Sequence, residues 1–196
     1  MVEVAGVVLA GGRSIRFGRD KLAEPYRGIP MLQHAVLRLA ELCSEVIVVL
    51  GPDAPPPPMP VGVPVRIARD ATAEEGPLAG AHAGLLATAA DVALVTGGDM
   101  PDLQLRVLLE MLHVVDDSGV DAVALQDGER YRPLPCVVRT AAAADASHAL
   151  LHAGQRALSD LLGALRLAVI DEPTWLALDP GRRTLFDVDT PSDLGE

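Results

Sequence analysis

Four cationic side chains follow a pair of glycines near the start of the chain, in the segment LAGGRSIRFGRDK. The cations are Arg13, Arg16, Arg19 and Lys21. Cations at this density supply charge for a polyphosphate, and Gly11 and Gly12 let backbone N–H groups approach a bound anion. The whole chain has 16 Lys and Arg against 27 Asp and Glu, a formal net charge of −11. The segment therefore favours a phosphate-binding loop over the simpler alternative, a solvated surface loop.

Spacing excludes the two best-known phosphate loops. A Walker loop ends in Gly-Lys followed by Ser or Thr, whereas Gly18 is followed here by Arg, Asp and Lys. The dinucleotide fingerprint G-x-G-x-x-G is missing as well, which disfavours a nicotinamide-dependent reductase. The loop has the features of a nucleotide-binding loop, but it belongs to neither of these two classes.

Asp99 is the second candidate, in the turn GGDMP after the apolar run Val92–Thr96. Mg²⁺ favours one or two carboxylates together with phosphate oxygens, so a carboxylate here is well placed to hold it. The alternative is that Asp99 caps the following helix. Because Pro101 begins that helical stretch, we expect Asp102 to be nearer the cap, which favours the metal role for Asp99.

Asp70 and the segment GPLAG, residues Gly76 to Gly80, form a third group. Asp70 is suited to bind a nucleobase or ribose, or simply to form a turn. Pro77 fits the first position of a helix. Gly76, Gly80 and Gly84 recur every four residues and share one helical face, which predicts close approach to a sheet or to a ligand.

The segment FDVDTPSDL near the end of the chain carries two further candidate carboxylates, Asp187 and Asp189. They point the same way if the segment is extended, and then face a metal together; a solvated pair is the alternative. Thr190 and Pro191 predict a helix start with Asp193 as its capping partner.

Short apolar runs alternate with helical patterns along the chain, which predicts a three-layer α/β/α sandwich with a mainly parallel sheet in a single domain, residues 1–196. The expected strands are Val4–Leu9, Glu45–Leu50, Val65–Ala68, Val92–Thr96, Asp121–Leu125, Tyr131–Arg139 and Leu167–Ile170. The expected helices are Met31–Leu42, Leu78–Ala89, Leu103–Asp117, Ala141–His152 and Leu158–Leu162. Ligands bind at the carboxyl ends of such strands, where the candidates of the first three groups fall.

Composition limits the partners and the location. The acidic balance argues against nucleic acid or an anionic membrane as the main partner. No signal pattern or membrane-spanning apolar run is present, and Cys43 and Cys136 are expected to be reduced and buried, which favours the cytoplasm. The five histidines show no shared ligand spacing, and Trp175 is expected to pack in the core.

Taken in order, the Gly/Arg loop, Asp70 with GPLAG, GGDMP and FDVDTPSDL resemble the nucleotidyltransferases of Rossmann-like, glycosyltransferase-A type fold. More closely, the set is similar to the molybdenum cofactor guanylyltransferases of the MobA type. DGERYRP and LHAGQRALSDLL also resemble that group, so the likeness covers almost the whole chain.

The resemblance implies a role for each matching residue. Leu9, Ala10, Gly11 and Gly12 contact the nucleotide, as do Asp70, Gly76, Pro77 and Leu78. Lys21 and Arg16 engage the phosphates as catalytic residues, and Asp99 binds Mg²⁺ near the α-phosphate. Asp189 is a second candidate for the metal, and Asp187 and Asp189 for the acceptor. Residues 1–125 then form the nucleotide-binding half and 126–196 the acceptor side.

The implied reaction transfers GMP from GTP to the phosphate of molybdopterin and releases pyrophosphate. Mg²⁺ is the implied cofactor, and transient contact with proteins of molybdenum cofactor biosynthesis or with acceptor proteins is also implied. Two departures keep alternatives open: Gly51 stands where the family often has asparagine, and Asp187 and Asp189 replace asparagines. The alternatives are a molybdopterin cytidylyltransferase, a sugar or phospho-acid nucleotidyltransferase, and a catalytically inactive nucleotide-binding regulatory module.

Overall fold

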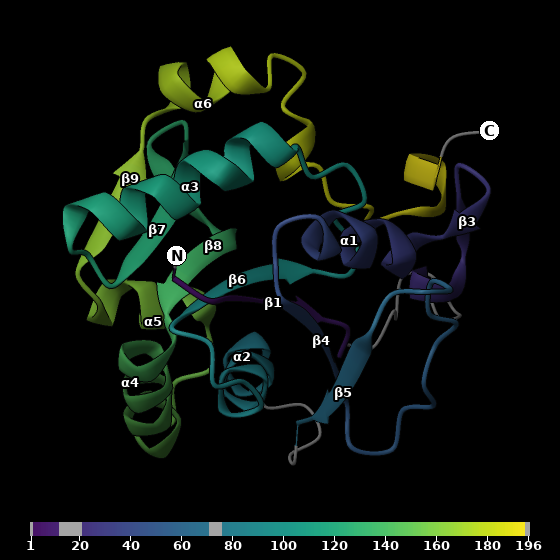
Figure 1. Cartoon of the computed structure of the whole chain (residues 1–196), viewed down its shortest axis with the longest axis horizontal. Coiled ribbons are helices and arrows are strands. Elements are labelled where there is room, and N and C mark those ends of the chain that lie inside the picture. Colours follow the sequence, from purple (N-terminus) through teal and green to yellow (C-terminus); the bar gives the residue numbers. More distant parts are fainter. Residues whose placement is uncertain (1, 12–20, 71–75, 195–196) are drawn as a thin grey trace.

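The computed structural model describes residues 2–11, 21–70 and 76–194 (Figure 1). Among these residues, seven strands form one sheet in the order β5-β4-β1-β6-β8-β7-β9. They are β1 (Val4–Leu9), β4 (Glu45–Leu50), β5 (Val65–Arg69), β6 (Val92–Gly97), β7 (Ala122–Asp127), β8 (Arg130–Arg139) and β9 (Leu167–Ile170). The helices are α1 (Met31–Ala40), α2 (Pro77–Leu86), α3 (Leu105–Ser118), α4 (Thr140–His152), α5 (Leu158–Ala164) and α6 (Glu172–Leu178).

The sheet is mainly parallel, as the sequence predicts. Strand β1 pairs in parallel with β4 and β6, β4 with β5, and β7 with β9. Strand β8 is antiparallel to both β6 and β7. Only two residues separate β7 from β8, and Gly128 takes a φ of 62° there. Such a short connection can join only antiparallel neighbours.

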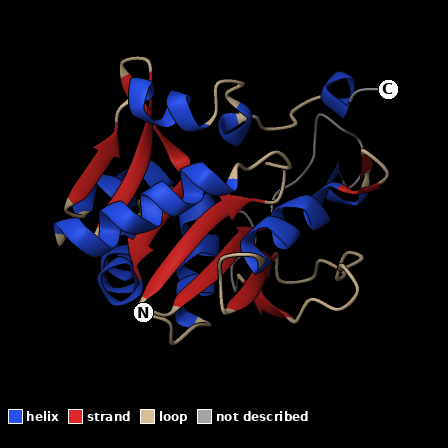
Figure 2. Cartoon of the chain, turned by 45° about the horizontal axis from the view of Figure 1, so that its top comes forward, coloured by secondary structure: helices blue, strands red, loops and turns tan. Residues whose placement is uncertain are grey.

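Helices cover both faces of the sheet (Figures 1 and 2). Helices α1 and α3 and Trp175 pack on one face, and α2, α4 and α5 pack on the other. Successive residues of β4 point alternately to the two cores: Val48 joins the first, and Ile47 and Val49 join the second. This confirms the three-layer sandwich and explains why the central strands read as unbroken apolar runs.

Several short elements were not predicted from the sequence, among them the following. Strands β2 (Pro25–Tyr26) and β3 (Ile29–Pro30) form a small antiparallel hairpin, and α6 contains the fully buried Trp175. A 3₁₀ turn, η2 (Arg183–Leu185), follows α6. All are too short to produce a periodic pattern, and α6 depends on tertiary contacts such as the hydrogen bond from Trp175 Nε1 to the Gln126 carbonyl, 2.8 Å.

Asp102 lies nearer than Asp99 to the N-cap of its helix, as expected, but its side chain does not cap the helix. Helix α3 begins at Leu105 and its N-cap is Gln104, which makes no side-chain capping bond. The Asp102 carboxylate instead accepts hydrogen bonds from Tyr26 Oη at 3.0 Å and from both terminal nitrogens of Arg27 at 2.8 and 3.0 Å. It therefore fastens the β2–β3 hairpin, a contact with no signal in the local sequence.

The glycine face of α2 packs against the sheet. A Cβ on Gly80 would lie 3.6 Å from the Leu9 side chain, and one on Gly84 would collide with Val7. For these two positions, close approach to the sheet accounts for the recurring glycines. Among the described residues, no helix has the length and apolar character needed to span a bilayer.

We expect Gly84→Ala to lower the free energy of unfolding by up to about 2 kcal/mol. Overpacking a core costs about 1–3 kcal/mol, which exceeds the gain of about 1 kcal/mol from replacing glycine in a helix. The matched control is Gly163→Ala in α5, where a new Cβ meets nothing within 4 Å. Urea unfolding should show a loss for the first variant and no loss for the second; equal effects would contradict the packing argument.

Candidate active site

Lys21 and Asp99 are in direct contact at the carboxyl-terminal edge of the sheet. Lys21 begins a 3₁₀ turn, η1 (Lys21–Ala23), and Asp99 follows the buried strand β6. Lys21 Nζ donates to Asp99 Oδ2 at 2.8 Å and to the Val188 carbonyl at 2.9 Å. The two side chains keep 17% and 29% of their surface exposed, so this charge pair remains open to an incoming ligand.

Backbone contacts hold this pair in place. Gly98 N donates to the Leu9 carbonyl at 2.9 Å, and Val188 N donates to the Asp99 carbonyl at 3.0 Å. A Cβ on Gly97 would collide with the Asp99 carboxylate. Glycine at position 97 therefore leaves the room in which the carboxylate lies, and the C-terminal segment is fastened to the end of β6.

Asp189 is a second carboxylate close to Lys21. Its Oδ1 is 3.8 Å from Lys21 Nζ, and its side chain is 54% exposed. Asp193 accepts hydrogen bonds from the backbone N–H groups of Asp189 and Thr190 at 3.0 and 2.7 Å, as the capping expectation required. These bonds, above all those from Thr190, hold the pKa of Asp193 below its ordinary value. The helix that follows is a single 3₁₀ turn, η3 (Pro191–Leu194).

Asp187 has a different partner from Asp189, contrary to the expectation that both face one metal. Its Oδ1 accepts from Arg132 Nη2 at 3.1 Å, on strand β8. Only Asp189 lies beside Lys21. Within the described part of the chain, no group of three His, Cys, Asp or Glu side chains is arranged to hold a metal ion. A metal held by Asp99 or Asp189 would thus need oxygens from the substrate.

The end of β1 lies beside the turn that carries Asp99, because Leu9 is paired with Gly97. Ala10 N donates to the Val49 carbonyl at 2.9 Å, so Leu9 and Ala10 are fixed within the sheet. Gly11 is exposed, has no left-handed φ, and would meet no atom closer than 3.5 Å if it carried a Cβ. Among the described residues, a Cβ at this position would make ordinary van der Waals contact with the backbone at Gly51, without a clash. Gly12 and Arg16 lie outside the described residues.

Asp70 and the start of α2 follow β5. Asp70 N donates to the Leu50 carbonyl at 2.9 Å, and Pro77 occupies the first turn of α2 after Gly76, as expected. Gly76 has a φ of 83°, and a Cβ there would come within 2.9 Å of the Arg156 carbonyl oxygen. Leu78 N donates to the same carbonyl at 3.2 Å. This glycine is therefore required by both its backbone angle and its neighbour.

Two participants had no assigned role in the sequence. The Val188 carbonyl binds Lys21, and a backbone oxygen leaves no signal in residue type. Arg132 contacts Asp187 at 3.1 Å and lies 3.7 Å from Asp127. It lies in the segment DGERYRP, whose charges alone do not indicate a partner 55 residues away.

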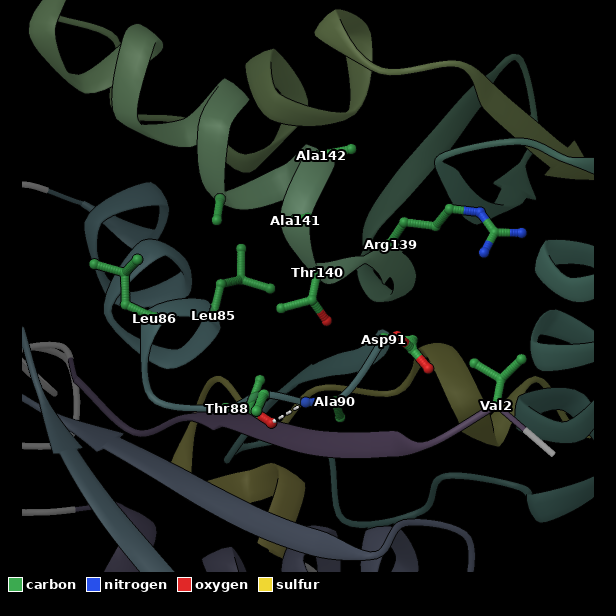
Figure 3. Close-up of a pocket in the computed structure, with 12 residues that line it drawn as sticks. Val2, Leu85, Leu86, Thr88, Ala90, Asp91, Arg139, Thr140, Ala141 and Ala142 are labelled. Atoms are coloured by element: carbon green, nitrogen blue, oxygen red, sulfur yellow. Dashed lines mark hydrogen bonds between the residues drawn. The ribbon is translucent and has the colours of Figure 1, made fainter.

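Two other features lie away from this edge. A hollow of about 710 Å³ at the opposite edge of the sheet is lined mostly by alanines and leucines, with Thr140 and Asp91 among them (Figure 3). The rings of His82, His148 and His152 lie in a row on α2 and α4, with centroids 5.8 and 4.5 Å apart. Burial is the main cause that lowers the pKa of His82, and the charge of the nearby His148 is the second.

Sequence comparison identifies the family. The model of the family described as a MobA-like NTP transferase domain matches residues 6–168. The chain belongs to this family. Lys21, Asp70 and Asp99 lie within the matched residues of this MobA-like chain, whereas Val188 and Asp189 lie beyond them.

Two curated relatives of this MobA-like chain are similar over most of its length. A protein of Chloroflexus aggregans named probable molybdenum cofactor guanylyltransferase is 35% identical over 196 residues, covering 97% of this chain and 91% of that protein. A protein of the same name from Mycobacterium tuberculosis is 36% identical over 178 residues, covering 87% of this chain and 86% of that one.

Solved structures share the fold at lower identity. Molybdopterin-guanine dinucleotide biosynthesis protein A from Archaeoglobus fulgidus superposes with a TM-score of 0.78 at 20% identity, covering 97% of this chain and 94% of that one. A 2-C-methyl-D-erythritol 4-phosphate cytidylyltransferase from Thermus thermophilus gives 0.69 at 19% identity, with coverage of 96% and 94%. The fold is thus that of nucleotidyltransferases.

Proposed function

We propose that this protein is a molybdenum cofactor guanylyltransferase, which transfers GMP from GTP to the phosphate of molybdopterin and releases pyrophosphate. The observation that carries the proposal is the contact between Lys21 and Asp99, open to solvent at the sheet edge of a MobA-like chain. The names of the two curated relatives support guanine as the base and the molybdenum cofactor as the acceptor.

In the reaction, an oxygen of the molybdopterin phosphate attacks the α-phosphorus of GTP. A new phosphorus–oxygen bond forms, the bond to the β-phosphate bridging oxygen breaks, and pyrophosphate leaves with that electron pair. No protein nucleophile is needed, because positioning and charge stabilisation carry this chemistry. Lys21 neutralises phosphate charge, assisted by Arg16, and the strand ends at Leu9, Ala10 and Asp70 position the nucleotide.

The residues present fit a magnesium ion. Asp99 offers a partly exposed carboxylate, and Gly97 leaves the room in which that carboxylate lies. One carboxylate, with Asp189 as a second candidate, is what Mg²⁺ needs when phosphate oxygens complete its ligands. When bound, Mg²⁺ supplies positive charge that reduces repulsion between the two anionic substrates.

We propose that the two halves of the chain bind different substrates. We assign the nucleotide to residues 1–125 and the acceptor to residues 126–196, with Asp187 and Asp189 on the acceptor side. Carboxylates there repel a phosphate, so their role is to accept hydrogen bonds from N–H groups of the acceptor. We place the reaction in the cytoplasm, where free thiols such as Cys43 and Cys136 persist.

A nucleotide panel tests the choice of base. We expect GTP with Mg²⁺ to raise the melting temperature more than CTP or ATP does, because a ligand that binds only the folded state stabilises it. Pyrophosphate release from GTP and molybdopterin tests the chemistry. A larger shift and faster release with CTP would establish the cytidylyltransferase alternative, and a GTP shift without any pyrophosphate release would favour the regulatory module.

A further inference from the structure

A hollow of about 550 Å³ opens beside the candidate active site. Its walls come from four places: the β2–β3 hairpin, the residues that follow Asp99, the end of β7, and the segment after α6. The side chains on which the argument depends are Tyr26, Arg27, Asp102, Arg182, Arg183 and Phe186. In Figure 1 the yellow C-terminal segment runs toward β3, which brings these distant parts of the sequence together.

Backbone strain is concentrated at this hollow. Among the described residues, the non-glycine residues with positive φ are Arg27, at 46°, and Arg182, at 54°. Both are arginines, and both line the hollow. Such conformations persist only where the surrounding contacts hold them, and they cluster at ligand sites. The contacts are present here: Arg27 is held by Asp102, and Arg182 by Asp127 at 2.6 Å and by Glu172.

A third arginine, Arg183, also lines the hollow, and its guanidinium makes no hydrogen bond or ion pair within the described part of the chain. It is exposed at the rim, in a protein whose formal net charge is −11. An unpaired guanidinium next to two paired ones is available to an anionic or carbonyl-bearing ligand.

Aromatic side chains are scarce in this protein and two of them meet here. The whole chain has two Tyr, two Phe and one Trp, and Tyr26 and Phe186 both line the hollow. The Arg27 guanidinium lies over the Tyr26 ring, 4.8 Å from its centroid. Tyr26 itself is only 5% exposed, so the flat surfaces open to a ligand are the half-buried Phe186 ring and the Arg27 guanidinium, whose side chain is 56% exposed. These surfaces, edged by carboxylate groups, suit a planar heterocycle that has both hydrogen-bond donors and acceptors.

The hollow and the Lys21–Asp99 pair are connected by the same chain segments. Phe186 lies two residues before Val188, whose carbonyl binds Lys21, and Asp102 lies three residues after Asp99. Tyr26 and Val188 are buried in one small apolar cluster, against which Phe186 packs. A ligand whose phosphate is at Lys21 can therefore extend its other end into the hollow.

We propose that this hollow binds the heteroaromatic end of the acceptor, a pterin ring system, while the acceptor's phosphate lies at Lys21 and Asp99. This inference rests on the proposed function and extends the acceptor site from Asp187 and Asp189 into the adjoining hollow, which Phe186 lines. The ring packs against Phe186 and against the Arg27 guanidinium that covers Tyr26, and Arg183 binds its carbonyl or an anionic substituent.

The test is a fluorescence titration of the full chain with 6-carboxypterin in the presence of saturating GTP and Mg²⁺. Saturating GTP occupies the nucleotide site, where a pterin could otherwise replace guanine. We expect the wild type to bind and Arg183→Ala to bind at least about tenfold more weakly, as for loss of one charge-assisted hydrogen bond. Arg27→Gly should show a similar loss without backbone strain, because glycine readily adopts positive φ.

Arg38→Ala is the matched control, since Arg38 is an exposed arginine of α1 whose side chain is paired with Glu41. It should bind the pterin as the wild type does. Melting temperatures report folding, and the GTP-induced shift should be the same in all variants. Absence of pterin binding by the wild type, or equal binding by Arg183→Ala, would overturn the proposal.

Steady-state kinetics separate this proposal from the proposed function. With molybdopterin as acceptor, Arg183→Ala should raise the KM for the acceptor more than it lowers kcat. If the wild type releases no pyrophosphate from GTP and molybdopterin, the proposed function fails. The pterin titration still decides the hollow, because it requires no turnover.

Discussion

Replacement of Lys21 by alanine is expected to lower turnover by at least about 100-fold, the usual loss on removing one preorganised charge donor. The Lys21 ammonium is 2.8 Å from Asp99 and 3.8 Å from Asp189. Without it, the carboxylates of Asp99 and Asp189 remain beside the position proposed for the triphosphate and lose the charge of Lys21. Repulsion should then increase most in the transition state, where charge develops on the leaving pyrophosphate.

Pyrophosphate release at saturating GTP measures this effect. Lys21→Arg keeps the charge and should retain more activity than Lys21→Ala, although its planar fork cannot reproduce both contacts of the ammonium. Because Lys21 also holds the Val188 carbonyl, the melting temperature of each variant must be compared with that of the wild type. Turnover close to normal in a folded Lys21→Ala variant would refute the catalytic role.

Replacement of Asp99 by asparagine should shift the Mg²⁺ dependence of the reaction to higher concentration and lower turnover about 100-fold at the wild-type optimum. Asparagine preserves the shape beside Gly97 and still accepts a hydrogen bond from Lys21. It lacks the negative charge that attracts a hard cation. The change therefore isolates charge from packing.

Asp189→Asn is the matched comparison for Asp99→Asn. Asp189 is more exposed, 54% against 29%, and lies 3.8 Å from Lys21 rather than 2.8 Å. Its neutralisation should have the smaller effect on the Mg²⁺ titration, which is followed by pyrophosphate release. An unchanged Mg²⁺ dependence in Asp99→Asn would remove Asp99 from the metal site, and a larger effect at Asp189 would transfer the main role to that residue.

Local sequence patterns were sufficient to predict the central strands and the alternation of strands with helices along the chain. Val4–Leu9 and Glu45–Leu50 are apolar runs buried on both faces, and the structure gives both strands the same limits. Boundaries moved where tertiary contacts decided them: the helix expected from Leu103 begins at Leu105. Asp102 does not cap this helix, because its carboxylate binds Tyr26 and Arg27 of the β2–β3 hairpin.

From the sequence alone, candidate residues could be assigned to one edge of the sheet, since apolar runs that are followed by Gly and Asp predict strands that deliver these groups to that edge. Only the tertiary structure decided which charges meet. Lys21 and Asp99 are 78 residues apart, and Arg132 and Asp187 are 55 apart. The physical reason is that periodicity reports which face of an element is buried, whereas a long-range pair depends on the packing of several elements at once.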